Sequence, residues 1–155
     1  MISRRRIALL PLALWGAAPV RAASLPTTTS LQEELAAALR QGRPLVVMAS
    51  LEGCPFCRTV RDSYLAPLRL ETGQPVVQLD MGSAQAVRDF DGTQRTHDQV
   101  LRGWKIAIAP TVLFFGRGGR EVAQRLAGTS IPDFYGAYLD ERVRLAQRSL
   151  GQATP

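Results

Sequence analysis

Two cysteines three residues apart, Cys54 and Cys57, follow directly after an apolar run of strand length at residues 45–49. A continuous apolar run of this length predicts a strand that is covered on both faces. The two are the only cysteines in the chain, so each must partner the other, a metal ion or another protein. A C-x-x-C at the junction of such a strand with a helix is typical of a redox-active dithiol. The pattern therefore predicts an α/β domain with thiol chemistry at that junction.

Residues 1–22 have the composition of a secretory signal. Arginines occupy positions 4–6, residues 7–18 are apolar, and Val20 and Ala22 place small side chains at −3 and −1 of a cleavage site. The apolar stretch of twelve residues is shorter than the ~20 that span a bilayer. We expect cleavage after Ala22 by the general or the twin-arginine route, with a retained membrane anchor as the alternative.

Removal of this segment takes away four arginines and leaves 15 basic and 13 acidic residues. Such a balance, with no long basic run, excludes nucleic acid as an expected partner. Export places the protein in the periplasm or an equivalent compartment, where disulfides persist. We expect residues 23–30 to be a polar linker, 31–150 a single folded domain and 151–155 a short tail.

Helix and strand patterns alternate along this domain. Ser30 and Glu33 form a capping-box signature for a first helix that stops at Gly42. A second helix follows the cysteines and is expected to end near Pro67. Residues 76–81 predict a strand, 82–95 a polar loop, and Thr96 the cap of a third helix.

The last third of the chain predicts a strand at 112–115, a glycine turn at 116–119 and an antiparallel partner at 121–126. Ser130 or Ile131 is expected to open a final helix with Pro132 in its first turn. We expect the inward stripe of that helix to be Ile131, Tyr135, Leu139, Val143 and Ala146. The order α-β-α-β-α-β-β-α predicts a four-stranded mixed sheet flanked by helices on both faces.

The strand–CPFC–helix segment, the Ala109-Pro110-Thr111 segment about fifty residues later, the hairpin and the last helix together resemble the thioredoxin superfamily. Within it the chain is most similar to periplasmic thioredoxin-like proteins of the SoxW type, and more distantly to the catalytic domain of the isomerase DsbC. The resemblance implies the thioredoxin fold and thiol–disulfide exchange with protein substrates without a cofactor. It also implies a cis Pro110 that faces the cysteines and binds substrate together with Ala109 and Phe56.

The positions of the two cysteines predict different chemical roles for them. Cys54 falls at the N-cap of a helix with Pro55 in its first turn, where backbone N–H groups and the helix dipole stabilise a thiolate. Cys54 is therefore the expected nucleophile, and Cys57, one turn further, resolves the mixed disulfide. The loop between them is too short for a structural disulfide to add much stability. A non-enzymatic copper or zinc carrier remains the alternative from another class.

Several positions depart from classical thioredoxins, which have a buried Asp six residues before the first cysteine and a Trp directly before it. Met48 and Gly53 stand there. Glu52 partly replaces the missing acid or, as we prefer, is a solvated loop carboxylate. We expect His97 in the exposed first turn of its helix rather than as a metal ligand.

The direction of electron flow remains open between two alternatives. We expect a monomeric reductase recharged by a membrane thiol transporter, with a thiol oxidase as the alternative.

Overall fold

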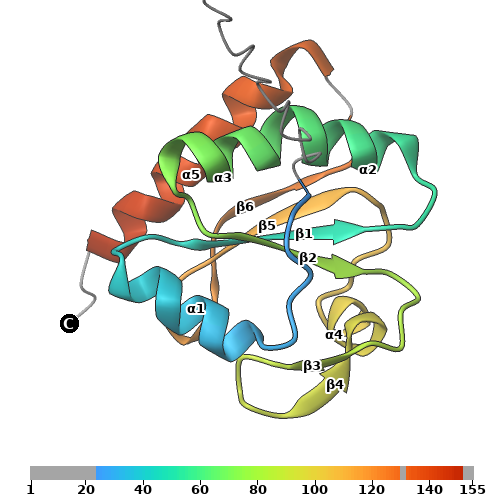
Figure 1. Ribbon diagram of the computed structural model, residues 1–155. Coiled ribbons are helices and arrows are strands. Elements are labelled where there is room, and N and C mark those ends of the chain that lie inside the picture. Colours follow the sequence, from blue (N-terminus) through green and yellow to red (C-terminus); the bar gives the residue numbers. More distant parts are fainter. Residues whose placement is uncertain (1–23, 130–131, 152–155) are drawn as a thin grey trace, which may run out of the picture.

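The computed structural model describes residues 24–129 and 132–151 (Figure 1). The expected signal segment lies outside them. The elements, in chain order, are α1 (Leu31–Arg40), β1 (Leu45–Ser50), α2 (Pro55–Val60), the π-helix η1 (Arg61–Leu65), α3 (Ala66–Thr72), β2 (Val76–Asp80), β3 (Ala86–Arg88), β4 (Gln94–Thr96), α4 (His97–Gly103), β5 (Thr111–Phe115), the 3₁₀ turn η2 (Arg117–Gly119), β6 (Glu121–Ala127), the 3₁₀ turn η3 (Pro132–Phe134) and α5 (Tyr135–Gly151). None of the described helices is long and apolar enough to cross a membrane.

The main sheet has four strands in the order β2-β1-β5-β6. β1 is parallel to β2 and antiparallel to β5, and β5 is antiparallel to β6. β1 is buried along its whole length, because helices cover both faces of the sheet. The predicted fold class, a mixed four-stranded α/β sheet, is confirmed.

Two apolar cores lie on opposite faces of this sheet. On one face, α1 and α4 pack against alternate residues of β1, such as Leu45 and Val47. On the other, the α2–η1–α3 helix and α5 pack against Val46 and Met48 (Figure 1). Because side chains alternate along a strand, every second residue of β1 points toward the helix that carries the cysteines. Cys57 itself belongs to this second core.

The helix after the cysteines does not end near Pro67, as the sequence suggested, but continues to Thr72. Proline has no N–H to donate and its ring clashes with the carbonyl four residues back. The chain accommodates it by widening one turn into η1, in which Ala66 N–H donates to Arg61 O, five residues earlier. The π-turn explains why a proline interrupts neither the helix nor its packing.

Two other sequence expectations need correction. Residues 82–95 are not a simple loop, because they contain β3 and most of β4, which form a small antiparallel hairpin. The expected polar linker packs on the domain from residue 25 onward, with Leu25 and Thr28 buried. Backbone bridges join Thr27 to Gln78 and Ser30 to Arg88. Residues 25–30 therefore extend the folded domain rather than precede it.

The inward stripe of the final helix follows the prediction where it is described, but Pro132 lies in η3 and α5 begins only at Tyr135. η3 leads into α5, and Tyr135, Leu139 and Ala146 are buried while Val143 is partly buried against the same core. Ile131, the first residue of the predicted stripe, lies outside the described residues, as does the tail after Gly151.

Candidate active site

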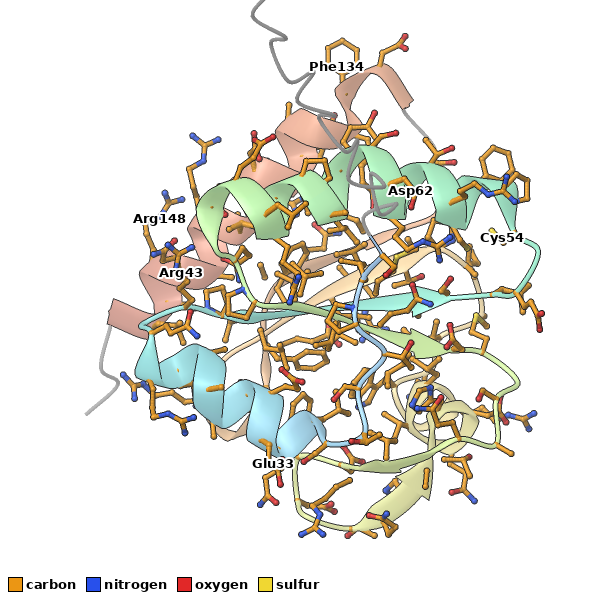
Figure 2. The ribbon with its side chains drawn as sticks, in the orientation of Figure 1. Glu33, Arg43, Cys54, Asp62, Phe134 and Arg148 are labelled. Carbon is orange, nitrogen blue, oxygen red and sulfur yellow. The ribbon has the colours of Figure 1, made fainter. Side chains whose placement is uncertain are left out.

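Cys54 occupies the turn between β1 and α2, at the end of the sheet (Figure 2). It is the N-cap of α2, and its Sγ accepts a hydrogen bond from the Cys57 N–H at 3.1 Å. Pro55 takes the first helical position, where the missing N–H has no consequence. Backbone N–H groups at a helix N-terminus favour negative charge that develops on the sulfur they face. The geometry thus supports Cys54 as the attacking sulfur.

Cys57 lies one turn inside the helix and is only 1% exposed. Both cysteines are free thiols in this structure. Burial raises the pKa of the Cys57 thiol, and the hydrogen bond with Cys54 raises it further. The Leu51 backbone and the Ser50 hydroxyl act in the opposite direction and lower that pKa. Cys57 is therefore shielded from substrates but adjacent to Cys54, as a resolving thiol must be.

Gly53, which precedes the first cysteine, has a φ of +73°. A residue with a Cβ is strained in this left-handed region, whereas glycine adopts it at little steric cost. This turn conformation gives a physical reason for glycine in place of the tryptophan of classical thioredoxins.

The Ala109–Pro110 peptide bond is cis, as the resemblance implies. Pro110 immediately precedes β5, and because β5 is antiparallel to β1, with Ala49 opposite Thr111, this segment lies at the same end of the sheet as the cysteines. Thr111 Oγ1 donates to Ile108 O at 2.7 Å, and Gly128 N–H donates to Pro110 O at 2.8 Å. Ala109 and Cys54 pack against the same core. The structure therefore brings the predicted substrate-binding segment to the end of the sheet that carries the cysteine pair.

Large apolar side chains are exposed in the loops and in the first turn of α2 at this end. Leu51 is 47% exposed, Phe56 60% and Ile108 55%. They come from the β1–α2 turn, from between the two cysteines and from the segment before Pro110. Exposed apolar groups gathered at one end of a domain are typical of a protein-binding surface.

A polar cleft of about 480 Å³ opens on the other side of Cys54, between the ends of β1 and β2. Ser50, Arg58, Arg61 and Asp80 are among its lining residues. Sequence reasoning missed Ser50 and Asp80. The available signal was that both are polar residues at or near the ends of two strands that a helix connects, where ligand and catalytic groups commonly lie.

Two further residues singled out by the sequence, Glu52 and His97, differ in their exposure. Glu52 is exposed in the β1–α2 turn and lines the cleft, in line with a solvated carboxylate. The expectation that His97 is exposed is wrong, because its side chain is fully buried. Its Nδ1 accepts from Asp80 N–H at 3.1 Å, and its Nε2 lies 3.0 Å from Thr28 O. A ring with both nitrogens occupied in this way has a structural role rather than that of a ligand.

The donor set around the cysteines bears on the metal alternative. No group of three His, Cys, Asp or Glu side chains in the described part of the chain is arranged to hold a metal ion. An ion bound at this site would rely on the two sulfurs alone.

The sheet order, the helix-capping cysteine and the cis proline define a protein of the thioredoxin fold with a dithiol site. A sequence model of the thioredoxin-like domain matches residues 31–142, and the chain belongs to that family. No curated protein sequence matches it.

Solved structures of low identity share the fold. The oxidized thioredoxin O2 of Arabidopsis thaliana is 14% identical with a TM-score of 0.52, covering 77% of this chain and 96% of that one. DsbH oxidoreductase is 17% identical with a TM-score of 0.55, covering 90% and 95%. A poplar thioredoxin h is 19% identical with a TM-score of 0.51, covering 76% and 96%. Fold and cysteine pair together are those of a thioredoxin-like thiol–disulfide oxidoreductase.

Proposed function

We propose that the protein is an exported, monomeric thiol–disulfide reductase of periplasmic protein substrates, recharged by a membrane thiol transporter. One observation carries the proposal: Cys54 is partly exposed at a helix N-terminus, where its Sγ accepts a backbone N–H, and it lies beside the buried Cys57. Cys54 attacks a substrate disulfide and forms a mixed disulfide. Cys57 then attacks Cys54 Sγ, so that the substrate leaves reduced and the pair leaves oxidized.

Protein rather than small-molecule substrates are favoured by the apolar side chains around the site. Phe56 lies in the first turn of α2 and Ile108 in the segment before Pro110, and both are more than half exposed. An extended substrate segment that covers them and pairs with the backbone at Pro110 buries apolar area on both partners.

The reductase direction and export from the cytoplasm are supported by the sequence. Strongly oxidising centres have an ionisable residue between the cysteines that stabilises the thiolate further. Here the two residues between the cysteines, Pro55 and Phe56, are not ionisable. The resemblance to SoxW-type proteins, which implies an external electron supply, points the same way. Residues 1–22 support export.

Titration of the mature protein in defined thiol–disulfide buffers tests the proposal. We expect a reversible two-electron equilibrium with a potential nearer to that of thioredoxin (about −270 mV) than to that of DsbA (about −120 mV). Replacement of either cysteine by serine is expected to abolish the equilibrium. A potential near the upper value would instead support the thiol oxidase. A pair with no reversible equilibrium that retains stoichiometric copper or zinc would support the metal carrier.

Substrate recognition can be tested separately with Ile108→Ser. We expect insulin reduction to slow several-fold while reduction of the small hydroxyethyl disulfide stays unchanged, because only a large partner covers this side chain. Leu70→Ser is the matched control, since Leu70 is 67% exposed on α3, in a part of the chain remote in sequence from both cysteine and proline segments. Equal rates for the two variants would contradict a docking role for this surface.

A further inference from the structure

The buried resolving thiol requires a route for its proton. Cys57 must be deprotonated before it attacks Cys54, yet burial raises its pKa and holds it in the neutral form. At the position where classical thioredoxins have a buried acid, the side chain is Met48, which is fully buried and cannot accept a proton. Another group must take that role if the dithiol is to turn over at neutral pH.

Strand alternation directs the Ser50 side chain toward the cysteine face. Val46 and Met48 pack in the same core as Cys57, and Ser50 follows in the same alternation. Ser50 is only 2% exposed, and the effect of its hydroxyl is to lower the pKa of the Cys57 thiol. It also lines the polar cleft. Ser50 thus links the buried thiol to the cleft.

Asp80 lies beside Ser50 on the neighbouring strand. The two residues are direct partners in the parallel β1–β2 register, so their side chains point to the same face of the sheet. Gln78 Nε2 donates to Asp80 Oδ1 at 2.7 Å, and Gln78 Oε1 in turn accepts from Arg61 at 3.2 Å. The backbone N–H of Asp80 is held by the His97 ring. Hydrogen bonds to both the backbone and the side chain of Asp80 therefore position its carboxylate in the cleft.

We propose that Ser50 is a further catalytic residue, which passes the proton of Cys57 through the cleft to the Asp80 carboxylate. This inference rests on the proposed thiol–disulfide exchange. The Cys57 S–H proton moves to Ser50 Oγ as the hydroxyl proton leaves toward Asp80, so that the serine is unchanged. The Cys57 thiolate then forms the bond to Cys54 Sγ, the bond from Cys54 to the substrate sulfur breaks, and the departing thiolate takes up a proton from Asp80 or solvent.

The other ionisable groups around the site are less suited to accept this proton. Tyr135 of α5 is buried, and burial raises its pKa, so it stays a neutral phenol. Arg61 is cationic and hydrogen-bonded to Asp62 and Gln78. Glu52 is exposed in the turn before the cysteines. Cys54 and Arg58 also line the cleft, Tyr64 packs against the same core, and His97 binds the Asp80 N–H.

A stopped-flow reaction with dithionitrobenzoate separates the two chemical steps. Attack by Cys54 on this symmetrical aryl disulfide releases one thionitrobenzoate, and resolution by Cys57 releases the second. The experiment uses the reduced mature protein and the variants Ser50→Ala, Asp80→Asn and Glu52→Gln, measured over a range of pH. Asp80→Asn keeps an oxygen for Gln78, Glu52→Gln is the control carboxylate on the same cleft, and Ser50→Thr keeps the hydroxyl.

At neutral pH we expect the second release to slow about 100-fold in Ser50→Ala and Asp80→Asn, the low end of what general base catalysis contributes. The first release should keep its rate, Glu52→Gln should match the wild type, and Ser50→Thr should restore the second phase. The defect should disappear as the pH approaches the raised pKa of Cys57, because the thiol then ionises without help. A purely structural defect would persist at every pH.

Three results would overturn the inference. They are an unchanged second phase in Ser50→Ala or Asp80→Asn, a slowing that is independent of pH, and a slowing confined to Glu52→Gln. Failure of the proposed function would look different, because the wild type itself would then release no second thionitrobenzoate.

Discussion

Replacement of His97 should destabilise the protein far more than a residue in the first turn of a short helix normally would. The ring is fully buried and joins two segments distant in the sequence, through Asp80 N–H at 3.1 Å and Thr28 O at 3.0 Å. His97→Ala leaves both backbone groups without this partner, at about 1–3 kcal/mol each, and removes the packing of the ring as well. We expect a total loss of about 3–5 kcal/mol in the free energy of unfolding.

The two bonds can be separated with His97→Asn. The asparagine side-chain oxygen reaches the position of Nδ1, so the bond from Asp80 N–H is kept while the one to Thr28 is lost. The expected loss is about half that of the alanine variant. Arg102→Ala on the same helix is the control, because it removes only an exposed ion pair with Asp98 and should cost less than about 1 kcal/mol.

Urea unfolding followed by circular dichroism measures all three variants in one assay. The reasoning would be refuted by a loss below about 1 kcal/mol for His97→Ala, which is within the range of a surface substitution. The reasoning would also be refuted if the asparagine and alanine variants were equally unstable. The hydrogen bond that His97→Asn keeps would then make no contribution to stability.

Three further predictions concern the packing and ionisation of single groups. Gly119→Ala should unfold more easily than Gly118→Ala: both glycines have a φ near +70°, but only at Gly119 would a Cβ meet the Phe90 ring, at 2.6 Å. Thermal unfolding of the pair isolates that clash. Tyr135→Phe should stabilise the protein by about 1 kcal/mol, because the buried hydroxyl has no hydrogen-bond partner among the described residues; a loss measured in urea would contradict this. Since the folded-state pKa of Cys57 is raised, its contribution to stability is complete below the unfolded thiol pKa of about 8.5 and is lost as the pH rises toward the folded value. Urea titrations of reduced protein at increasing pH should show this loss, and Cys57→Ala should lack it.

Local patterns in the sequence were sufficient for most of the fold and for the cysteine pair. Three kinds of signal act within a few residues of chain: the apolar run before Cys54, the capping residues Ser30 and Thr96, and the glycine turn before β6. Their effect on secondary structure can be predicted without knowing which segments pack against them. The cis Pro110 followed from a resemblance rather than from such a pattern.

The errors occurred where a distant segment decides the outcome. Pro67 normally ends a helix, but packing of the long helix on the sheet favours a π-turn that retains it. His97 looks like a polar surface residue until the segment around Thr28 and the end of β2 cover it and occupy both its nitrogens. No periodicity in the neighbourhood of either residue carries this information.

The sequence by itself determined where the proposed chemistry of this protein lies, because both cysteines and the helix start that holds the first of them lie within four consecutive residues. Only the tertiary structure decided what surrounds that chemistry. The pairing of β1 with β2 brings Asp80 next to Ser50, and the pairing of β1 with β5 brings Pro110 to the same end of the sheet. Strand pairing joins residues about thirty and sixty positions apart, and its register depends on the burial of whole faces, which no short stretch of sequence specifies.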